Sequence, residues 1–136
     1  MVRAAPHPGL RPGVMSYRGF RTDAGRLHRS LEIPVGVVSL LLGLGKPFRV
    51  LGSSRDPRGA CSSTALLCGL QDRSFVGERD GRSAGVEVVM TPWAAFTLFG
   101  VPMKELAGSV TPVEDLPDPE FGELNADLCA IRSTGG

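Results

Sequence analysis

The chain has 136 residues, of which 42% are apolar, and its formal net charge is +1. This length suits one domain with a hydrophobic core and is too short for two. The near-neutral charge gives no global field that would favour nucleic acid or a membrane surface as a partner.

The first thirteen residues are rich in proline and glycine, so we expect them to be extended or loosely ordered. They contain no apolar stretch of the kind that a signal peptide needs. The longest apolar run, residues 37–45, is far below the roughly 18 to 20 residues that span a bilayer. Three cysteines without a CxxC pair predict reduced thiols. The expected location is the cytoplasm, with no membrane partner.

The next part of the chain predicts a series of strands. Residues 14–22 contain Tyr17 and Phe20, and residues 27–34 alternate roughly between apolar and polar side chains up to Pro34. Residues 36–45 form a short apolar run between glycines, which fits a strand buried on both faces better than a helix. A further extended segment, 46–52, follows after a Gly-Lys-Pro turn.

Turn chemistry divides the following segments. Residues 52–64 are rich in Ser, Gly, Asp and Pro and predict a surface loop, because no phosphate-binding glycine pattern is present. Residues 65–71 predict another buried strand. Residues 74–90 predict a hairpin, since Asp80-Gly81 supplies the residues that its turn would need. In its second strand, Val86, Val88 and Met90 should face one side and Glu87 and Val89 the other.

The hydrophobic period then changes to that of helices. Thr91 is a good N-cap, Pro92 suits the first helical position, and Gly100 can end the helix in the left-handed conformation. A second short helix should have Pro102 at its first position and be closed by Gly108. Residues 119–133 predict a final amphipathic helix with one apolar face, formed by Phe121, Leu124, Leu128 and Ile131. The whole pattern is α+β: a β-rich barrel or roll followed by short helices and a C-terminal helix.

The sequence shows no recognisable catalytic or metal-binding pattern. His7 and His28 are the only histidines, and no spacing of His, Cys, Asp or Glu suggests metal ligands. There is no GxSxG motif and no Cys/His pair with local support. We therefore expect no enzyme activity and no metal or other cofactor. Trp93, the only tryptophan, is expected to anchor the core.

The order of motifs resembles the N-terminal domain of a subset of AraC-type transcriptional regulators. The pattern GRxxGVxV fits residues 81–88, and TPxxAxxLxGVPxxELA fits residues 91–107. The segment VTPVEDL follows at 110–116. The resemblance covers roughly residues 8–130, and its most specific part is the block 81–108.

This resemblance implies a cupin-like sensor domain over residues 1–116 and a truncated, linker-like helix over 117–136. Such domains bind a small-molecule effector, mediate dimerisation, or do both. The helix-turn-helix half of these regulators has no counterpart here, so we expect no direct DNA binding by this chain. The twin helices should cover one mouth of the roll with their apolar faces, which are formed by Trp93, Phe96, Leu98, Phe99 and Leu106.

Residues for a ligand pocket are assigned by position near the predicted hairpin only: Arg73, Arg82 and Glu87. The face formed by Phe121, Leu124, Leu128 and Ile131 would make a homodimer contact or lead toward the missing half. Two alternatives stay open. One is a metal-dependent enzyme of the cupin class, and the other is a stand-alone dimerisation module or gene remnant.

Overall fold

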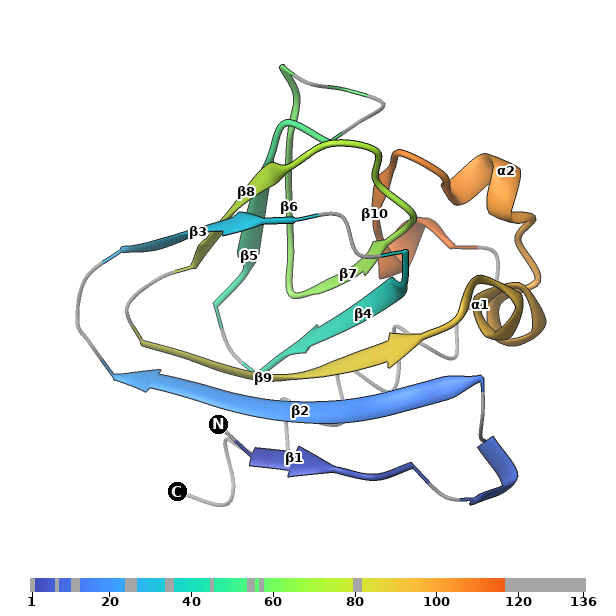
Figure 1. Ribbon diagram of the computed structural model, residues 1–136. Helices are drawn as coiled ribbons and strands as arrows, with labels where there is room; N and C mark the ends of the chain where they lie inside the picture. The colour runs from blue at the N-terminus through green and yellow to red at the C-terminus, as the bar shows by residue number, and fades with distance from the viewer. Residues whose placement is uncertain are drawn as a thin grey trace.

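The computed structural model consists mostly of antiparallel strands arranged in two sheets, with a few short helices (Figure 1). The residues that it describes are 2–6, 8–10, 13–23, 27–33, 36–44, 46–53, 56, 58–79 and 82–116. The β-rich α+β expectation is therefore confirmed for this part of the chain.

The larger sheet has six strands in the order β1-β2-β9-β4-β7-β10. Their bounds are Val2–Ala4, Val14–Asp23, Arg82–Met90, Val38–Gly43, Ala65–Cys68 and Val110–Pro112, in that spatial order. The smaller sheet has four strands in the order β3-β8-β5-β6. Their bounds are His28–Glu32, Phe75–Arg79, Phe48–Leu51 and Ala60–Ser63. Two short 3₁₀ helices, Pro8–Leu10 and Val113–Asp115, complete the strand-rich part.

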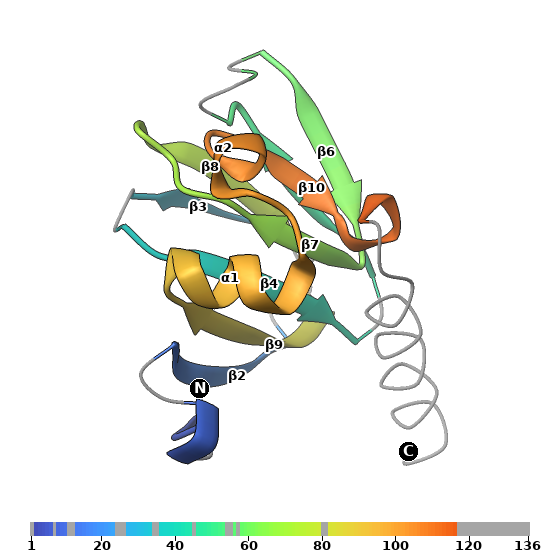
Figure 2. The same ribbon diagram turned by 90° about the vertical axis from the view of Figure 1, so that its right-hand side faces the viewer.

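Two helices, α1 (Pro92–Phe99) and α2 (Met103–Leu106), cover the outer face of the larger sheet (Figure 2). Alternation along the strands explains this, because successive side chains point to opposite faces. On β4, Val38, Leu40 and Leu42 join the buried cluster that contains α1 and α2. Leu41, between them, belongs instead to a second cluster on the other face of the sheet. This second face looks toward the smaller sheet.

Strand β9 shows the predicted alternation. Met90 and Val88 pack with the helix-side cluster, whereas Glu87 and Val89 face the space between the sheets. The glycine-bounded apolar run also forms a central strand, β4, as expected. The prediction of two differently lined faces on β9 is therefore confirmed.

The strands on either side of residues 80–81 do not form the predicted hairpin. Strand β8 pairs with β3 and β5 in the smaller sheet, while β9 pairs with β2 and β4 in the larger one. The turn residues 80–81 themselves lie outside the described part of the chain. The predicted pairing of β8 with β9 was wrong, because the nine-residue β9 pairs instead with the ten-residue β2, which is longer than the five-residue β8. The chain therefore passes from one sheet to the other at this point.

Three further segments differ from expectation, refine it or lie outside the described residues. Residues 52–64 were expected to be a loop, but Ala60–Ser63 form the edge strand β6. The first residues were expected to be extended, and Val2–Ala4 pair with β2 as an edge strand. The predicted final helix, with Phe121, Leu124, Leu128 and Ile131, lies outside the described residues.

Helix α1 begins and ends where the sequence predicts. The Thr91 hydroxyl accepts a hydrogen bond from the backbone N–H of Ala94 at 3.3 Å, and Gly100 ends the helix with a φ of 67°. The side of α1 that packs on the sheet is not the predicted one. Ala94, Ala95 and Phe99 are buried, whereas Trp93 is 61% exposed. The expectation that Trp93 anchors the core was wrong, because two small alanines let the helix lie close to the sheet instead.

The apolar faces of α1 and α2 therefore do not cover a mouth of the inter-sheet space. They lie on the outer face of the larger sheet, on the side away from the smaller sheet. Phe96 and Leu98 are exposed, like Trp93. Phe99 and Leu106 are the two members of the expected set that are buried.

Loss of the Thr91 cap should destabilise the domain modestly. In a Thr91→Ala variant the Ala94 N–H loses its side-chain acceptor, so we expect the free energy of unfolding to fall by about 1 kcal/mol. Urea denaturation measures this change. Thr91→Ser keeps the hydroxyl and should stay close to the original stability. Equal losses in both variants would show that the missing methyl group matters more than the cap.

Candidate functional site

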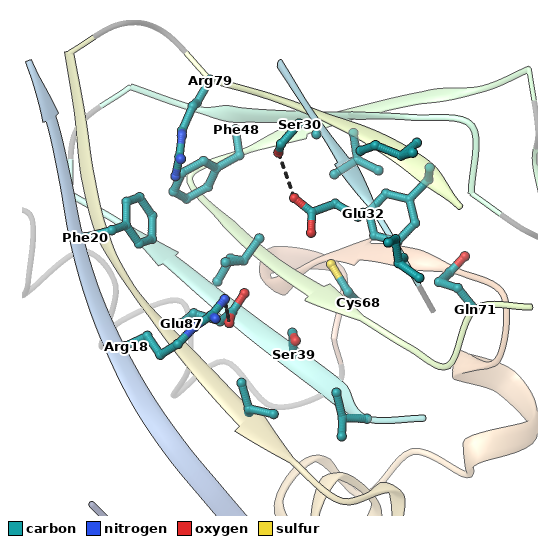
Figure 3. A pocket seen from close by; sticks show the side chains of 18 of the residues that line it. Arg18, Phe20, Ser30, Glu32, Ser39, Phe48, Cys68, Gln71, Arg79 and Glu87 are labelled. Carbon is teal, nitrogen blue, oxygen red and sulfur yellow. Dashed lines mark hydrogen bonds and ion pairs between the residues drawn. The ribbon is translucent and has the colours of Figure 1, made fainter. Parts of the chain in front are cut away.

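A cavity of about 710 Å³ lies between the two sheets (Figure 3). The larger sheet contributes side chains from β2, β4, β7 and β9 to its wall, and the smaller sheet contributes side chains from β3, β5 and β8. Both apolar and charged groups line it. A cavity of this size, with a few polar groups among apolar ones, is typical of small-molecule sites.

Strand register arranges the larger sheet's side of the cavity in rows. Arg18 of β2 lies opposite Glu87 of β9, and Glu87 lies opposite Leu41 of β4. A neighbouring row runs from Val89 to Ser39 and on to Cys68 of β7. Because all these strands are antiparallel neighbours, residues in one row share a face of the sheet. The polar groups of this wall are thus placed by pairing between distant segments.

Arg18 and Glu87 form a short ion pair across β2 and β9. The Arg18 Nη2 atom lies 2.6 Å from Glu87 Oε1, and the two side chains are 36% and 18% exposed. Charge-assisted contacts of this length are among the stronger polar interactions in proteins. The pair holds Glu87 against the wall and neutralises most of the charge of Arg18.

A cationic and aromatic corner lies where β2, β5 and β8 face one another. The guanidinium carbon of Arg79 is 5.0 Å from the centre of the Phe20 ring, within the range of a cation–π contact. The rings of Phe20 and Phe48 lie 5.7 Å apart at an angle of 55°. Figure 3 shows Arg79 beside these two rings, with its side chain directed into the cavity.

Carboxylates also line the cavity. The Ser30 hydroxyl donates a 2.8 Å hydrogen bond to Glu32 Oε1, and both residues line the cavity. Burial, with a smaller contribution from the negative charges of Glu87 and Glu32, raises the pKa of the Cys68 thiol to about 12. Both carboxylates therefore act on the region around Cys68. The cavity consequently contains both guanidinium and carboxylate groups, and Arg18 and Glu87 are paired with each other.

The Cys68 thiol should make stability fall at alkaline pH. Its pKa rises from the ordinary value of 9.0 to about 12 on folding, so the folded chain keeps a proton that the unfolded chain loses. The contribution of the protonated thiol to the free energy of unfolding is complete below pH 9. Above pH 9 it decreases by about 1.4 kcal/mol per pH unit. Between pH 8 and pH 10, Cys68→Ala should therefore gain about 1.4 kcal/mol relative to the original chain. Urea denaturation at the two pH values tests this, and parallel losses would contradict it.

The three pocket residues assigned from sequence fall in different places. Glu87 lines the cavity. Arg73 is exposed, contacts the neighbouring Asp72 with Nε and Oδ1 3.3 Å apart, and is not among the lining residues. Arg82 is the first residue of β9 and pairs with Asp23 of β2. Only its backbone belongs to the part of the chain that the structure describes. The structure thus brings neither Arg73 nor the described backbone of Arg82 into the cavity wall.

Sequence reasoning missed Arg18, Arg79 and the role of Phe20. A signal was present on β2, where Ser16, Arg18 and Phe20 alternate with Tyr17 and so share one face. On β8, Phe75, Gly77 and Arg79 do the same. Neither pattern reveals which face is turned toward the other sheet, because that depends on the pairing of strands far apart in the chain.

Among the described residues, no three His, Cys, Asp or Glu side chains come close enough together to hold a metal ion. His7 lies outside the described residues, and only the strand position of His28 is described. In the same part of the chain, no helix has the length and apolar character needed to cross a membrane.

Comparison with known proteins gives no match of the chain to a protein-family model, to a curated protein or to a solved structure. The cavity and the residues that line it are therefore the best indication of function.

Proposed function

We propose that this chain is a small-molecule sensor domain, a cupin-like roll whose interior binds an effector. The observation that carries the proposal is the cavity of about 710 Å³ between the sheets. Its size lies within the range of about 300 to 1,000 Å³ that is usual for ligand sites. It also combines an aromatic wall with charged groups that can orient a ligand.

The resemblance to AraC-type regulators extends this proposal to transcription regulation. Its most specific block, residues 81–108, corresponds to β9, α1 and α2, the elements that join the cavity wall to the helical layer. Glu87 lines the cavity, and Met90 of the same strand packs in the helix-side cluster. A ligand that shifts β9 would therefore move the surface on which the helices lie. In this proposal the DNA-binding half belongs to another polypeptide segment, and this chain does not bind DNA itself.

Self-association is the second part of the proposal, with the chain acting as a cytoplasmic homodimer. It is supported by the apolar periodicity of 119–133 and by exposed apolar side chains on α1. Trp93 and Phe96 are 61% and 52% exposed and lie three positions apart on one side of the helix. Exposed apolar patches commonly mark interaction sites. Light scattering over a concentration series tests it, and a monomer at every concentration would overturn it.

A neutral fluorescent probe, N-phenyl-1-naphthylamine, tests whether the cavity binds ligands. We expect one probe per chain, with increased emission, because the dye fluoresces more strongly in apolar surroundings. Ser39→Phe should abolish binding, since Ser39 lines the cavity and the larger side chain would occupy it. Ser74→Phe is the matched control, because Ser74 is exposed and outside the lining residues. Equal binding by both variants would contradict the proposal. A dimer without any probe binding would favour a plain dimerisation module.

A further inference from the structure

Two buried hydrogen-bond donors in the cavity wall lack acceptors. The Nε atoms of Arg18 and Arg79 are shielded from solvent and have no hydrogen-bond partner among the residues that the structure describes. Both residues line the cavity. A buried donor on a charged group that lacks an acceptor is costly, so such a group usually has an explanation. A ligand oxygen in the cavity would supply the missing acceptor.

The two arginines lie beside the same aromatic ring. Arg18 is two residues before Phe20 on β2, so the two side chains share a face. Arg79 approaches Phe20 from the smaller sheet, at 5.0 Å from its ring centre. Figure 3 shows Phe20 with Arg79 on one side and Arg18 farther along the same strand. One anionic group near Phe20 would be attracted by the guanidinium of Arg79 and would offer an acceptor to the Arg18 Nε–H.

The charges of the two arginines are not equally engaged. Glu87 neutralises Arg18 at 2.6 Å. Arg79 makes its cation–π contact with Phe20 and forms no ion pair with any residue that the structure describes. Arg79 therefore has charge available to a ligand, and Arg18 offers a further N–H.

The rest of the wall indicates what the anion should be attached to. Phe20, Leu41 and Phe75 pack partly buried against Phe48 and Val50, and all five line the cavity. This surface suits a flat apolar body. The carboxylates of Glu32 and Glu87 also line the cavity, and Glu87 is paired with Arg18. A second anionic group elsewhere on the ligand would meet these carboxylates, which disfavours dicarboxylates.

We infer that the cavity binds an organic monocarboxylate with a flat apolar body, its carboxylate held at Arg79 and its body against Phe20 and Phe48. This inference rests on the proposed function, since it specifies the ligand class of the same cavity. Arg79 is assigned as the residue that selects the charge of the ligand, and the aromatic wall selects its shape.

The test compares two compounds that differ in charge and hardly in shape, 3-phenylpropionate and 3-phenylpropanamide. Each is titrated, at neutral pH and fixed salt, against the full chain with N-phenyl-1-naphthylamine bound. We expect the carboxylate to displace the probe at least about tenfold more effectively than the amide, because a charged hydrogen bond replaces a neutral one. Arg79→Gln should remove this difference. Arg73→Gln, which changes an exposed arginine outside the cavity, should leave it intact.

The neutral probe separates failure of this inference from failure of the proposed function. If the probe does not bind, the cavity is not a ligand site and both fail. If it binds but the two compounds compete equally, only the inferred charge of the ligand is wrong. Probe binding by Arg79→Gln shows that the variant is folded. Arg79→Lys restores the charge without the planar guanidinium and should recover part of the preference, and no recovery would contradict the electrostatic role.

Discussion

A Gly69→Ala variant is expected to lose at least about 3 kcal/mol of unfolding free energy, enough to threaten the folded state of a domain this small. The added Cβ would lie 1.9 Å from the carbonyl oxygen of Leu106 and 2.7 Å from its carbonyl carbon. Both are backbone atoms, so no side-chain rotation can relieve the clash. Gly69 follows β7 directly, and Leu106 ends α2, so the clash separates the sheet from its helical layer.

Hydrogen bonds oppose any movement apart. Gly69 N–H donates to Ser109 O at 3.0 Å, and Gly108 N–H donates to Leu70 O at 2.6 Å. The Gln71 side chain adds a 2.9 Å bond from Nε2 to the same Ser109 oxygen. Moving Leu106 away from residue 69 would stretch these bonds, and Leu106 itself is buried in the helix-side cluster.

The matched control is Gly77→Ala in β8. There the nearest atom to an added Cβ is Glu32 Oε1 at 3.5 Å, an ordinary contact. We expect the stability of this variant to stay within about 0.5 kcal/mol of the original, as for a substitution without a clash. Urea denaturation of both variants measures the difference. A Gly69→Ala variant within 1 kcal/mol of the original would show that α2 is not held against β7 as the structure describes.

The sequence predicted part of this fold, but not contacts between distant segments such as the one between Gly69 and Leu106. The strand β4 and the helix α1 were predictable, because glycines bound the first and Thr91, Pro92 and Gly100 mark the ends of the second. These signals are local. The assignment of β8 and β9 to different sheets is not local, so the Asp80-Gly81 signal suggested a pairing that the structure does not have.

The candidate site was predictable to a smaller extent for the same reason. Glu87 was chosen for its position near the predicted hairpin, and it does line the cavity. Arg79 lies as near to that turn as Arg82 and nearer than Arg73, but nothing in the sequence distinguished it from them. What makes Arg79 different is the ring of Phe20, which comes from a strand about sixty residues earlier and from the other sheet. Such a contact depends on the order of the strands in the two sheets, which local sequence signals do not determine.

Two neighbouring leucines of β7 should separate the stability of the fold from the function of the cavity. Leu66 and Leu67 are both fully buried but face opposite sides of the larger sheet. Leu66 belongs to the cluster with Phe48 and Val50 on the cavity side, and Leu67 belongs to the cluster beneath α1 and α2. We expect Leu66→Ala and Leu67→Ala each to lower the unfolding free energy by about 2 to 5 kcal/mol. Urea denaturation measures both losses.

Binding of N-phenyl-1-naphthylamine should distinguish the two variants where stability does not. Removing Leu66 takes away the packing that supports Phe48 and Val50, which form part of the cavity wall. The probe should therefore bind more weakly to Leu66→Ala, because its aromatic contact surface is no longer held in place. Leu67→Ala leaves these contacts unchanged and should bind the probe as the original chain does, at temperatures where both variants are folded. Equal weakening in the two variants would mean that the helical layer and the cavity are coupled through the sheet. In that case β7, like β9, would be a route by which a bound ligand changes the helical surface.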